Sequence, residues 1–412
     1  MRGFACIGLK EYEGNEIMTK QPSRRALIVT LLIVCTMQMP HLAILPGTNL
    51  IATEVFPERG IQTIHSVMAL PGILSVIGSI LAGMLVRYGM ATKKNMTVLG
   101  LSLIGFAGVI AIFQGGHFWQ LGLMNVFIGT GTGIFVTTSQ SIMFDSFDEK
   151  TRRFMAATQF SCINGGALVM SLICGWLITI VWYGGHLMML ITLPIAVLAG
   201  IVLPAGERIK SVESGGAERT KVPPSVYYYA FMIFIYVILY SVAAMNVSTH
   251  IEQGALGDPA MAGVATAIMM GGGVVSGLVL PRVAQGLRDH VFTVSFIAMA
   301  FAFSLMNLFA SSLFVTFASM FIFGMSMSML IPRCIFQASN LSDPSNSATV
   351  SMLVCSIASG VGHTMSPIII TNITLALGGE STRFRFQFSA FVCLAIAVLT
   401  LLYNLHRERS RS

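Results

Sequence analysis

Residues 62–86 read QTIHSVMALPGILSVIGSILAGMLV, and residues 87–94, which follow directly, read RYGMATKK. The first stretch contains no Asp, Glu, Lys or Arg and is longer than the roughly 20 residues that an α-helix needs to cross a ~30 Å hydrocarbon core. Because the backbone has no water to pair with in lipid, such a segment is helical there. The basic residues after it mark the point where the chain leaves the apolar phase.

The same alternation of long apolar runs and short polar loops continues along all 412 residues, of which 55% are hydrophobic and 10% charged. A soluble domain carries about a quarter charged residues. A barrel would show alternating strands of about ten residues, and the sequence has no such pattern. We therefore expect an all-α membrane protein with spans near 26–52, 62–86, 95–114, 118–143, 154–180, 184–204, 226–249, 260–281, 291–309, 313–338, 347–377 and 386–405.

The positions of the basic residues predict the orientation. With a cytoplasmic N-terminus, all 24 Lys and Arg except Arg59, Arg383 and Arg385 fall in cytoplasmic segments, as the positive-inside rule requires. We expect a multi-pass protein of the cell (inner or plasma) membrane with both termini in the cytoplasm. The net charge of +7 is spread over these loops, without the basic stripe and aromatics of a nucleic-acid partner.

The predicted organisation has two helical bundles and three polar segments. Residues 1–25 form a cytoplasmic tail without a signal-peptide pattern, and both Met1 and Met18 are candidate starts. Residues 26–205 and 225–405 form six-helix bundles. Residues 206–224 form a cytoplasmic linker rich in Ser, Gly and Pro, and residues 406–412 a cytoplasmic tail.

The two bundles share an internal repeat. Matching small or polar residues recur in the same order 194 or 195 positions later: Gly78 and Gly83 as Gly272 and Gly277, Gly129 as Gly324, and Asn164-Gly165 and Ser171 as Ser359-Gly360 and Ser366. Ordered matches at one offset indicate two halves of one ancestry. Parallel repeats of this kind place a substrate site between the halves near the bilayer midplane.

Two loops and one span resemble the major facilitator superfamily. Residues 82–94, AGMLVRYGMATKK, resemble its signature loop, Gly-rich and then Asp-Arg-x-Gly-Arg-Arg, with Arg87 and Gly89 matching and Val86 in place of Asp. Residues 125–133, NVFIGTGTG, are similar to its Arg-x-x-x-Gly-x-Gly pattern, with Asn125 at the Arg position. Residues 145–153, DSFDEKTRR, resemble its connection between spans 4 and 5.

The resemblance implies twelve transmembrane helices in two pseudo-symmetric six-helix bundles. It implies a secondary transporter, a symporter or antiporter, that is not an enzyme. It also implies an inner gate, for which the candidates are Arg87, Gly89, Asp145, Arg152 and Arg333.

Acidic residues avoid the predicted membrane interior. Of the 17 Asp and Glu, none lies in the middle of a span; Glu54 and Asp145 lie at span ends. A carboxylate inside a membrane is costly and is usually kept for a function. Its absence argues against a midplane acid–proton couple and against a cavity for organic cations, which need a nearby counter-charge.

Histidine and amide side chains are the remaining candidates for binding and coupling. In span 1, Gln38, His41 and Thr48 share roughly one helical face, and in span 11 Ser356, Ser359, His363 and Ser366 do the same. An ordinary imidazole titrates near pH ~6.5, so His41 or His363 can carry a proton or bind substrate as a neutral group. The alternative is that each histidine only ties helices together.

Further candidates for substrate contact are Asn125, Gln159, Asn164, Tyr236, Tyr240 and Ser326. Arg333 either extends to the cytoplasmic surface or faces the cavity, where it would favour an anionic substrate. The seven Cys are scattered and show no metal-ligand spacing, and there is no nucleotide-binding motif. We expect neither a metal nor a cofactor.

The sequence thus predicts a secondary active transporter that moves a small organic solute by alternating access, with a neutral or weakly anionic substrate favoured. Its partners are the solute, protons or another coupling ion, and the lipid bilayer, and we expect a monomer. The alternatives are a hydrophobic multidrug efflux transporter and, from another class, a non-transporting membrane sensor on the same scaffold.

Overall fold

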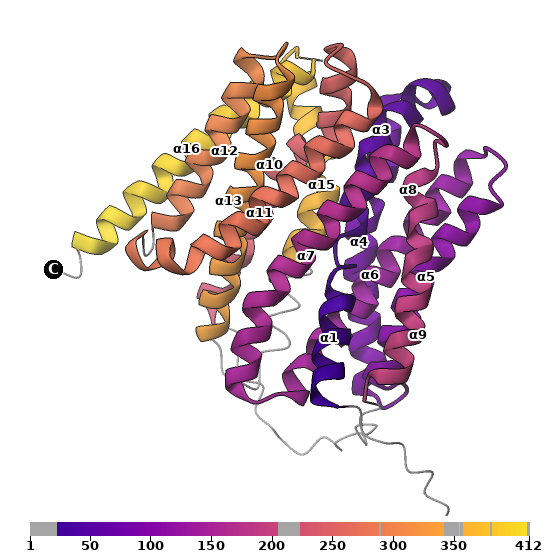
Figure 1. Ribbon diagram of the computed structural model, residues 1–412. Helices are drawn as coiled ribbons and strands as arrows, with labels where there is room; N and C mark the ends of the chain where they lie inside the picture. The colour runs from indigo at the N-terminus through magenta and orange to yellow at the C-terminus, as the bar shows by residue number, and fades with distance from the viewer. Residues whose placement is uncertain are drawn as a thin grey trace, which may run out of the picture.

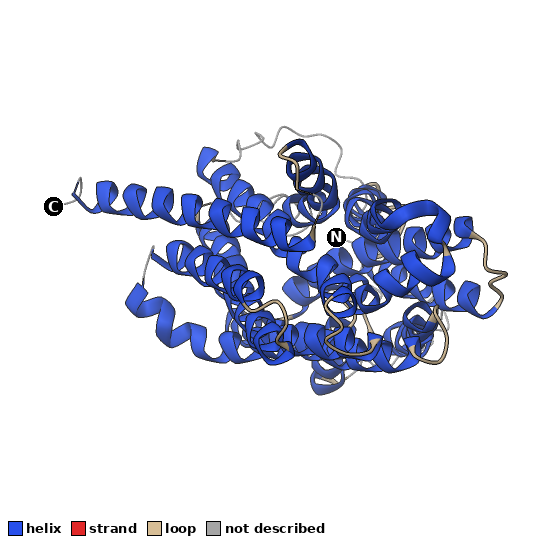
Figure 2. Ribbon diagram, turned by 90° about the horizontal axis from the view of Figure 1, so that it is seen from above, coloured by secondary structure: helices blue, strands red, loops and turns tan. Residues whose placement is uncertain are grey.

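The computed structural model describes residues 23–204, 223–287, 290–341, 354, 357–379 and 381–409. Among these residues the secondary structure is helical and contains no strand (Figure 2). The helices of the described parts group into twelve spans, six in each half of the chain. The N-terminal half, indigo to magenta in Figure 1, lies beside the C-terminal half, orange to yellow.

The N-terminal half begins with a segmented first span. It consists of α1 (Arg24–Cys35), α2 (Pro40–Ile44), η1 (Leu45–Gly47), α3 (Thr48–Leu50) and η2 (Ile51–Val55). After the turn η3 (Pro57–Arg59) the long helices are α4 (Gly60–Arg87), α5 (Lys93–Ile112), α6 (Phe118–Ser146) and α7 (Glu149–Ile178). The sixth span consists of α8 (Gly184–Leu187), η4 (Met188–Ile191) and α9 (Thr192–Val202).

The C-terminal half consists of longer uninterrupted helices: α10 (Pro224–Gln253), α11 (Pro259–Leu287), α12 (Val291–Leu308), α13 (Leu313–Asn340), α15 (Ala358–Ala376) and α16 (Thr382–Arg409). Eleven segments of the described residues are long and apolar enough to cross a membrane. The described part of the remaining helix, α15, has 19 residues and carries Ser359, His363 and Ser366. The predicted twelve-span, all-α fold is confirmed.

Two prolines explain why the first span is not the continuous helix that we expected. Pro40 and Pro46 have no N–H to donate to the preceding turn, and the chain between Cys35 and Pro40 forms a turn instead of a helix. The prediction that Gln38, His41 and Thr48 share one face therefore does not hold. Thr48 is fully buried and donates to the carbonyl of Leu45 at 2.7 Å.

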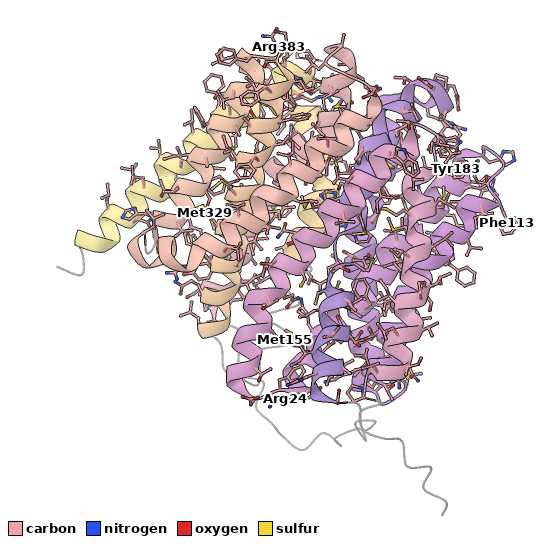
Figure 3. The ribbon with its side chains drawn as sticks, in the orientation of Figure 1. Arg24, Phe113, Met155, Tyr183, Met329 and Arg383 are labelled. Carbon is pink, nitrogen blue, oxygen red and sulfur yellow. The ribbon has the colours of Figure 1, made fainter. Side chains whose placement is uncertain are left out.

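We refer to the two ends of the bundle by labelled residues. The lower end carries Arg24 and Met155, and the upper end carries Tyr183 and Arg383 (Figure 3). At the lower end the Arg24 guanidinium donates to the Asp148 carboxylate. The hydrogen bond from Thr151, and then the charge of Arg24, hold the pKa of Asp148 below its usual value. These contacts attach the first span to the connection between α6 and α7.

The repeat in the sequence corresponds to equivalent helix crossings. In the N-terminal half Gly78 of α4 lies against the backbone of Thr130 in α6; in the C-terminal half Gly272 of α11 lies against that of Phe321 in α13. A glycine at these positions lets two backbones approach closely. A Cβ added to Gly83 or Gly277 would meet no described atom of another element within 4 Å, so a close helix crossing does not account for their recurrence.

The halves meet along two further glycine crossings. Helices α7 and α11 cross at Gly175 and Gly263, where a Cβ added to Gly263 would lie 2.6 Å from the Cα of Gly175. Helices α4 and α15 cross at Gly72 and Gly360, where a Cβ added to Gly72 would lie 2.7 Å from the Gly360 carbonyl oxygen. Figure 1 shows α7 and α11 side by side between the halves.

Hydrogen bonds join the halves at the upper end. Asn49 Nδ2 donates to Glu252 Oε2 at 2.7 Å, and Ser248 Oγ donates to the Pro46 carbonyl at 2.8 Å. Gln62 Nε2 donates to the carbonyl of Pro367 at 3.2 Å. The upper end is therefore closed.

Candidate functional site: a central cavity between the two halves

A cavity of about 300 Å³, called here the central cavity, lies between the halves. Its walls come from the first span, α4, α6 and α7 in the N-terminal half, and from α10, α13 and α15 in the C-terminal half. It extends from mid-depth, at Gly72 and Gly360, to Met143 and Ile335 near the lower ends of α6 and α13. Since the upper end is closed, the cavity lies on the lower side of the closure.

The two histidines singled out in the sequence meet in this cavity. His41 comes from the first span just after the break at Pro40, and His363 comes from α15. Their ring centroids are 4.9 Å apart in an edge-to-face arrangement. The Nδ1 atom of His363 lies 2.8 Å from Ser241 Oγ in α10. One histidine from each half thus forms a contact that any separation of the halves at this depth would break.

An amide pair lies beside the histidines. Gln38 and Gln159 both line the cavity, and Gln159 Nε2 lies 3.4 Å from Gln38 Oε1. This pair connects the first span with α7 inside the N-terminal half. Amides can donate and accept hydrogen bonds, so the pair can bind a polar neutral group on a solute.

The two tyrosines of α10 have different surroundings. Tyr240 lines the cavity, and no described residue forms a hydrogen bond with its hydroxyl. Tyr236 is buried away from the cavity, and its hydroxyl lies 2.6 Å from Ser326 Oγ. The rings stack with centroids 6.2 Å apart. Only Tyr240 is placed to contact a solute, and Ser326 is paired with Tyr236.

Other candidates from the sequence lie off the cavity wall. Asn125 Nδ2 donates to the Leu121 carbonyl at 3.0 Å, and Asn164 Nδ2 donates to the Phe160 carbonyl at 2.9 Å. Both are bonds to the preceding turn of the same helix. Ser359 does line the cavity, whereas Arg333 is not among the described lining residues.

Of the gate candidates, Gly89 is the one whose structural role is evident. It follows the end of α4 with φ = 68°, and the N–H of Met90 bonds the Leu85 carbonyl at 3.0 Å. This is the left-handed residue that ends many helices. The side chains of Arg87, Asp145 and Arg152 lie outside the described part of the structure.

Sequence reasoning missed several polar wall residues, namely Ser75 and Ser79 of α4 and Thr132 and Gln140 of α6. Ser75 and Ser79 are four residues apart, as are Thr132, Val136 and Gln140 in series, so each set shares one helical face. The four-residue spacing of these polar side chains is the feature of the sequence from which they could have been predicted to share a cavity wall. Among the described lining residues none is Asp or Glu, as expected from the acidic residues at span ends.

Comparisons with known proteins agree with this geometry. A family model described as Major Facilitator Superfamily matches residues 26–353. No curated protein sequence matches the chain. Among solved structures, a POT family transporter in complex with a thioalcohol-conjugated peptide has a TM-score of 0.71 and 15% identity, covering 92% of this chain and 96% of that one.

Two further solved structures are similar. A POT family transporter in complex with 5-aminolevulinic acid has a TM-score of 0.73 and 14% identity, covering 91% of this chain and 95% of that one. The human organic anion transporter MFSD10 (TETRAN) has a TM-score of 0.67 and 14% identity, covering 92% and 100%. At such identities these likenesses show the fold alone. With the family match over most of its length, its two helical halves and the cavity between them, the chain belongs to the Major Facilitator Superfamily.

Proposed function

We propose that the protein is a secondary active transporter that moves a small organic solute by alternating access, and that the solute is neutral or weakly anionic. The observation that carries this is the central cavity, which is closed at the upper end and has walls from both halves. Alternating access needs a site whose two walls can separate on either side in turn. The glycine crossings α7·α11 and α4·α15 are the surfaces about which the halves would rock.

The chemistry of the wall supports the solute class. The described wall offers amides, hydroxyls and two imidazoles, and no carboxylate. A strongly cationic solute would lose its hydration there without meeting a counter-charge, which is costly in a low-dielectric site. A neutral polar solute can pair with Gln38, Gln159 and Tyr240. A weak anion can in addition pair with a protonated histidine.

His41 and His363 are the proposed coupling groups. Two like charges 4.9 Å apart repel strongly when water is excluded, so the pair favours at most one proton. Separation of the halves would remove that restraint. Protonation and the conformational change would then depend on one another, and transport would vary with pH.

The first experiment is a thermal-shift screen of the purified protein against metabolites and drugs, since a ligand that binds only the folded state raises its apparent stability. Hits among small neutral or anionic metabolites support the proposal. The wall also contains apolar residues such as Met39, Leu42 and Phe160, which fit the second candidate, efflux of hydrophobic drugs. Hits confined to hydrophobic cations would favour that candidate and overturn the proposed solute class.

The second experiment tests coupling in proteoliposomes loaded with a solute from that screen. His41→Gln or His363→Gln retains a hydrogen-bonding side chain and removes the titration. We expect at least one variant to exchange solute across the membrane while losing gradient-driven accumulation. His117→Gln, at an exposed histidine before α6, is the matched control. If both variants accumulate solute with unchanged pH dependence, the histidines are structural and coupling is by another ion or absent.

A further inference from the structure

A second and smaller cavity, called here the upper chamber, lies between the central cavity and the upper end. Its volume is about 10 Å³, and its walls come from α4, α10, α15 and α16. Two nitrogen-rich side chains reach it: Arg385 from the C-terminal half and His65 from the N-terminal half. None of its described lining residues is Asp or Glu.

Arg385 is a buried cation with little compensation. The residue is 8% exposed, and Nη1 donates to Asn246 Oδ1 at 3.1 Å, while Nε is buried and has no hydrogen-bond partner among the described residues. A buried guanidinium is normally paired with a carboxylate, because desolvating an unpaired charge is costly. Arg385 also lies in the first turn of α16, where the helix dipole adds positive potential.

His65 supplies a second unpartnered nitrogen to the same chamber. The residue is 2% exposed, and within the described parts of the chain its buried Nε2 has no hydrogen-bond partner. Buried polar atoms in folded proteins are nearly always hydrogen-bonded. A group that binds in the chamber therefore has to accept a hydrogen bond from Arg385 Nε, and a negative charge on that group would offset the charge of the guanidinium.

We propose that the upper chamber binds one small monovalent anion of the size of chloride. A chamber of this volume holds about one water-sized guest. Water would accept the Nε–H bond of Arg385 but would leave the guanidinium charge uncompensated. A halide accepts that bond and neutralises the charge. Polyatomic anions such as sulfate or gluconate exceed the chamber in size, so the site discriminates by size as well as by charge.

The position of the chamber gives the anion a conformational role. His65 and Arg385 belong to different halves and line one chamber while the upper end is closed, so an anion between them stabilises this closed state. Ser241 lines the chamber and also contacts Nδ1 of His363 at 2.8 Å. This hydrogen bond links a wall residue of the chamber with a wall residue of the central cavity.

The test uses the purified full-length protein at constant ionic strength, with gluconate replaced stepwise by chloride. We expect saturable binding of radioactive chloride at about one ion per chain and a rise of about 3 °C or more in the unfolding midpoint. Bromide should substitute for chloride, and sulfate should not.

Three variants locate the ion. Arg385→Gln should abolish saturable binding because it removes the charge, and His65→Leu should weaken it by about tenfold, as expected for loss of one charge-assisted contact. Arg383→Gln is the matched control, because Arg383 lies two residues away at the upper end (Figure 3) and its Nη2 donates to the Asn307 carbonyl oxygen at 3.0 Å. It should bind chloride as the unchanged protein does.

Direct binding to the unchanged protein decides the proposal even if a variant fails to fold. Absence of saturable chloride binding would overturn it and leave water as the occupant. Binding that survives Arg385→Gln in folded protein would equally overturn it, since the ion would then be elsewhere. Solute binding in the central cavity is measured separately, so failure here leaves the proposed transport function standing.

Discussion

At the scale of single residues, the two stacked tyrosines of α10 separate structural from solute-binding roles. Tyr236→Phe removes a buried hydroxyl that pairs with Ser326, so we expect the free energy of unfolding to fall by about 1 kcal/mol with solute affinity unchanged. Tyr240→Phe removes a hydroxyl without a partner, so stability should be kept or improved while affinity changes. Thermal unfolding and solute titration of both variants measure the contrast.

Two outcomes of the Tyr236→Phe and Tyr240→Phe measurements would contradict these assignments. Equal loss of affinity in both variants would contradict the assignment of Tyr236 to the helix packing. A clear loss of stability in Tyr240→Phe would mean that its hydroxyl has a protein partner.

Single residues also show which parts of the site could be predicted from the sequence. His41 and His363 stood out because polar side chains are scarce within apolar spans. The contact between them could not be predicted, because it depends on which helices of the two halves face each other. Asn125 and Asn164 looked equally promising, yet each bonds the carbonyl four residues earlier in its own helix. A polar side chain that donates to its own helix has the same sequence pattern as one that faces a cavity.

At the scale of helices, Gly89 tests whether the signature loop needs glycine for its backbone. With φ = 68°, Gly89→Val places a β-branched residue in the left-handed region, at a cost of about 1–2 kcal/mol. Gly89→Asn should be tolerated much better, because Asn adopts this conformation readily. Chemical denaturation of both variants checks this. Equal stability of the two would show that φ at this position relaxes.

The crossing of α7 and α11 makes a second prediction at this scale. Gly263→Leu places a side chain where a Cβ alone would approach Gly175 to 2.6 Å, so the helices have to separate. Overpacking of this kind costs about 1–3 kcal/mol, which shifts a two-state equilibrium by about fivefold or more. We expect the population with an open upper end to increase. Distances between spin labels on α10 and the first span near Glu252 and Asn49 would report it.

Gly165→Leu is the matched control for this crossing, since Gly165 lies on α7 with no neighbour within 4 Å. It should leave the distance distribution unchanged. An unchanged distribution in Gly263→Leu as well would mean that the crossing yields without opening the upper end.

At the scale of the whole molecule, the sequence predicted the twelve helices and the two halves, because lipid demands long apolar helices and a repeat preserves its glycines. The sequence could not predict which end is closed. Both states of an alternating-access protein use the same helices and differ only in the contacts between halves. Here those contacts are the pairs at Asn49, Gln62 and Ser248, whose partners lie in the other half.

The orientation of the molecule remains a prediction from its charges, and it decides where the central cavity opens. The upper end contains Arg59, Arg383 and Arg385, and the other basic residues fall at predicted cytoplasmic positions, so the lower end should face the cytoplasm. Three variants test this orientation, each made after the seven native cysteines have been removed. Each carries one new cysteine, in place of Gly254 or Leu377 at the upper end or of Met90 at the lower end. An impermeant maleimide added to intact cells should label the first two and spare the third.

Leu377 and Met90 are 59% and 70% exposed, so access to reagent depends on the side of the membrane and not on burial. Labelling of Met90→Cys in intact cells, with Gly254→Cys and Leu377→Cys protected until the membrane is opened, would invert the orientation. The central cavity lies on the lower side of the closure. The predicted orientation therefore makes this an inward-facing state, in which a solute would exchange with the cytoplasm and the chloride-sized chamber would lie toward the cell exterior. An inverted result would exchange those two compartments and leave the internal geometry of both sites unchanged.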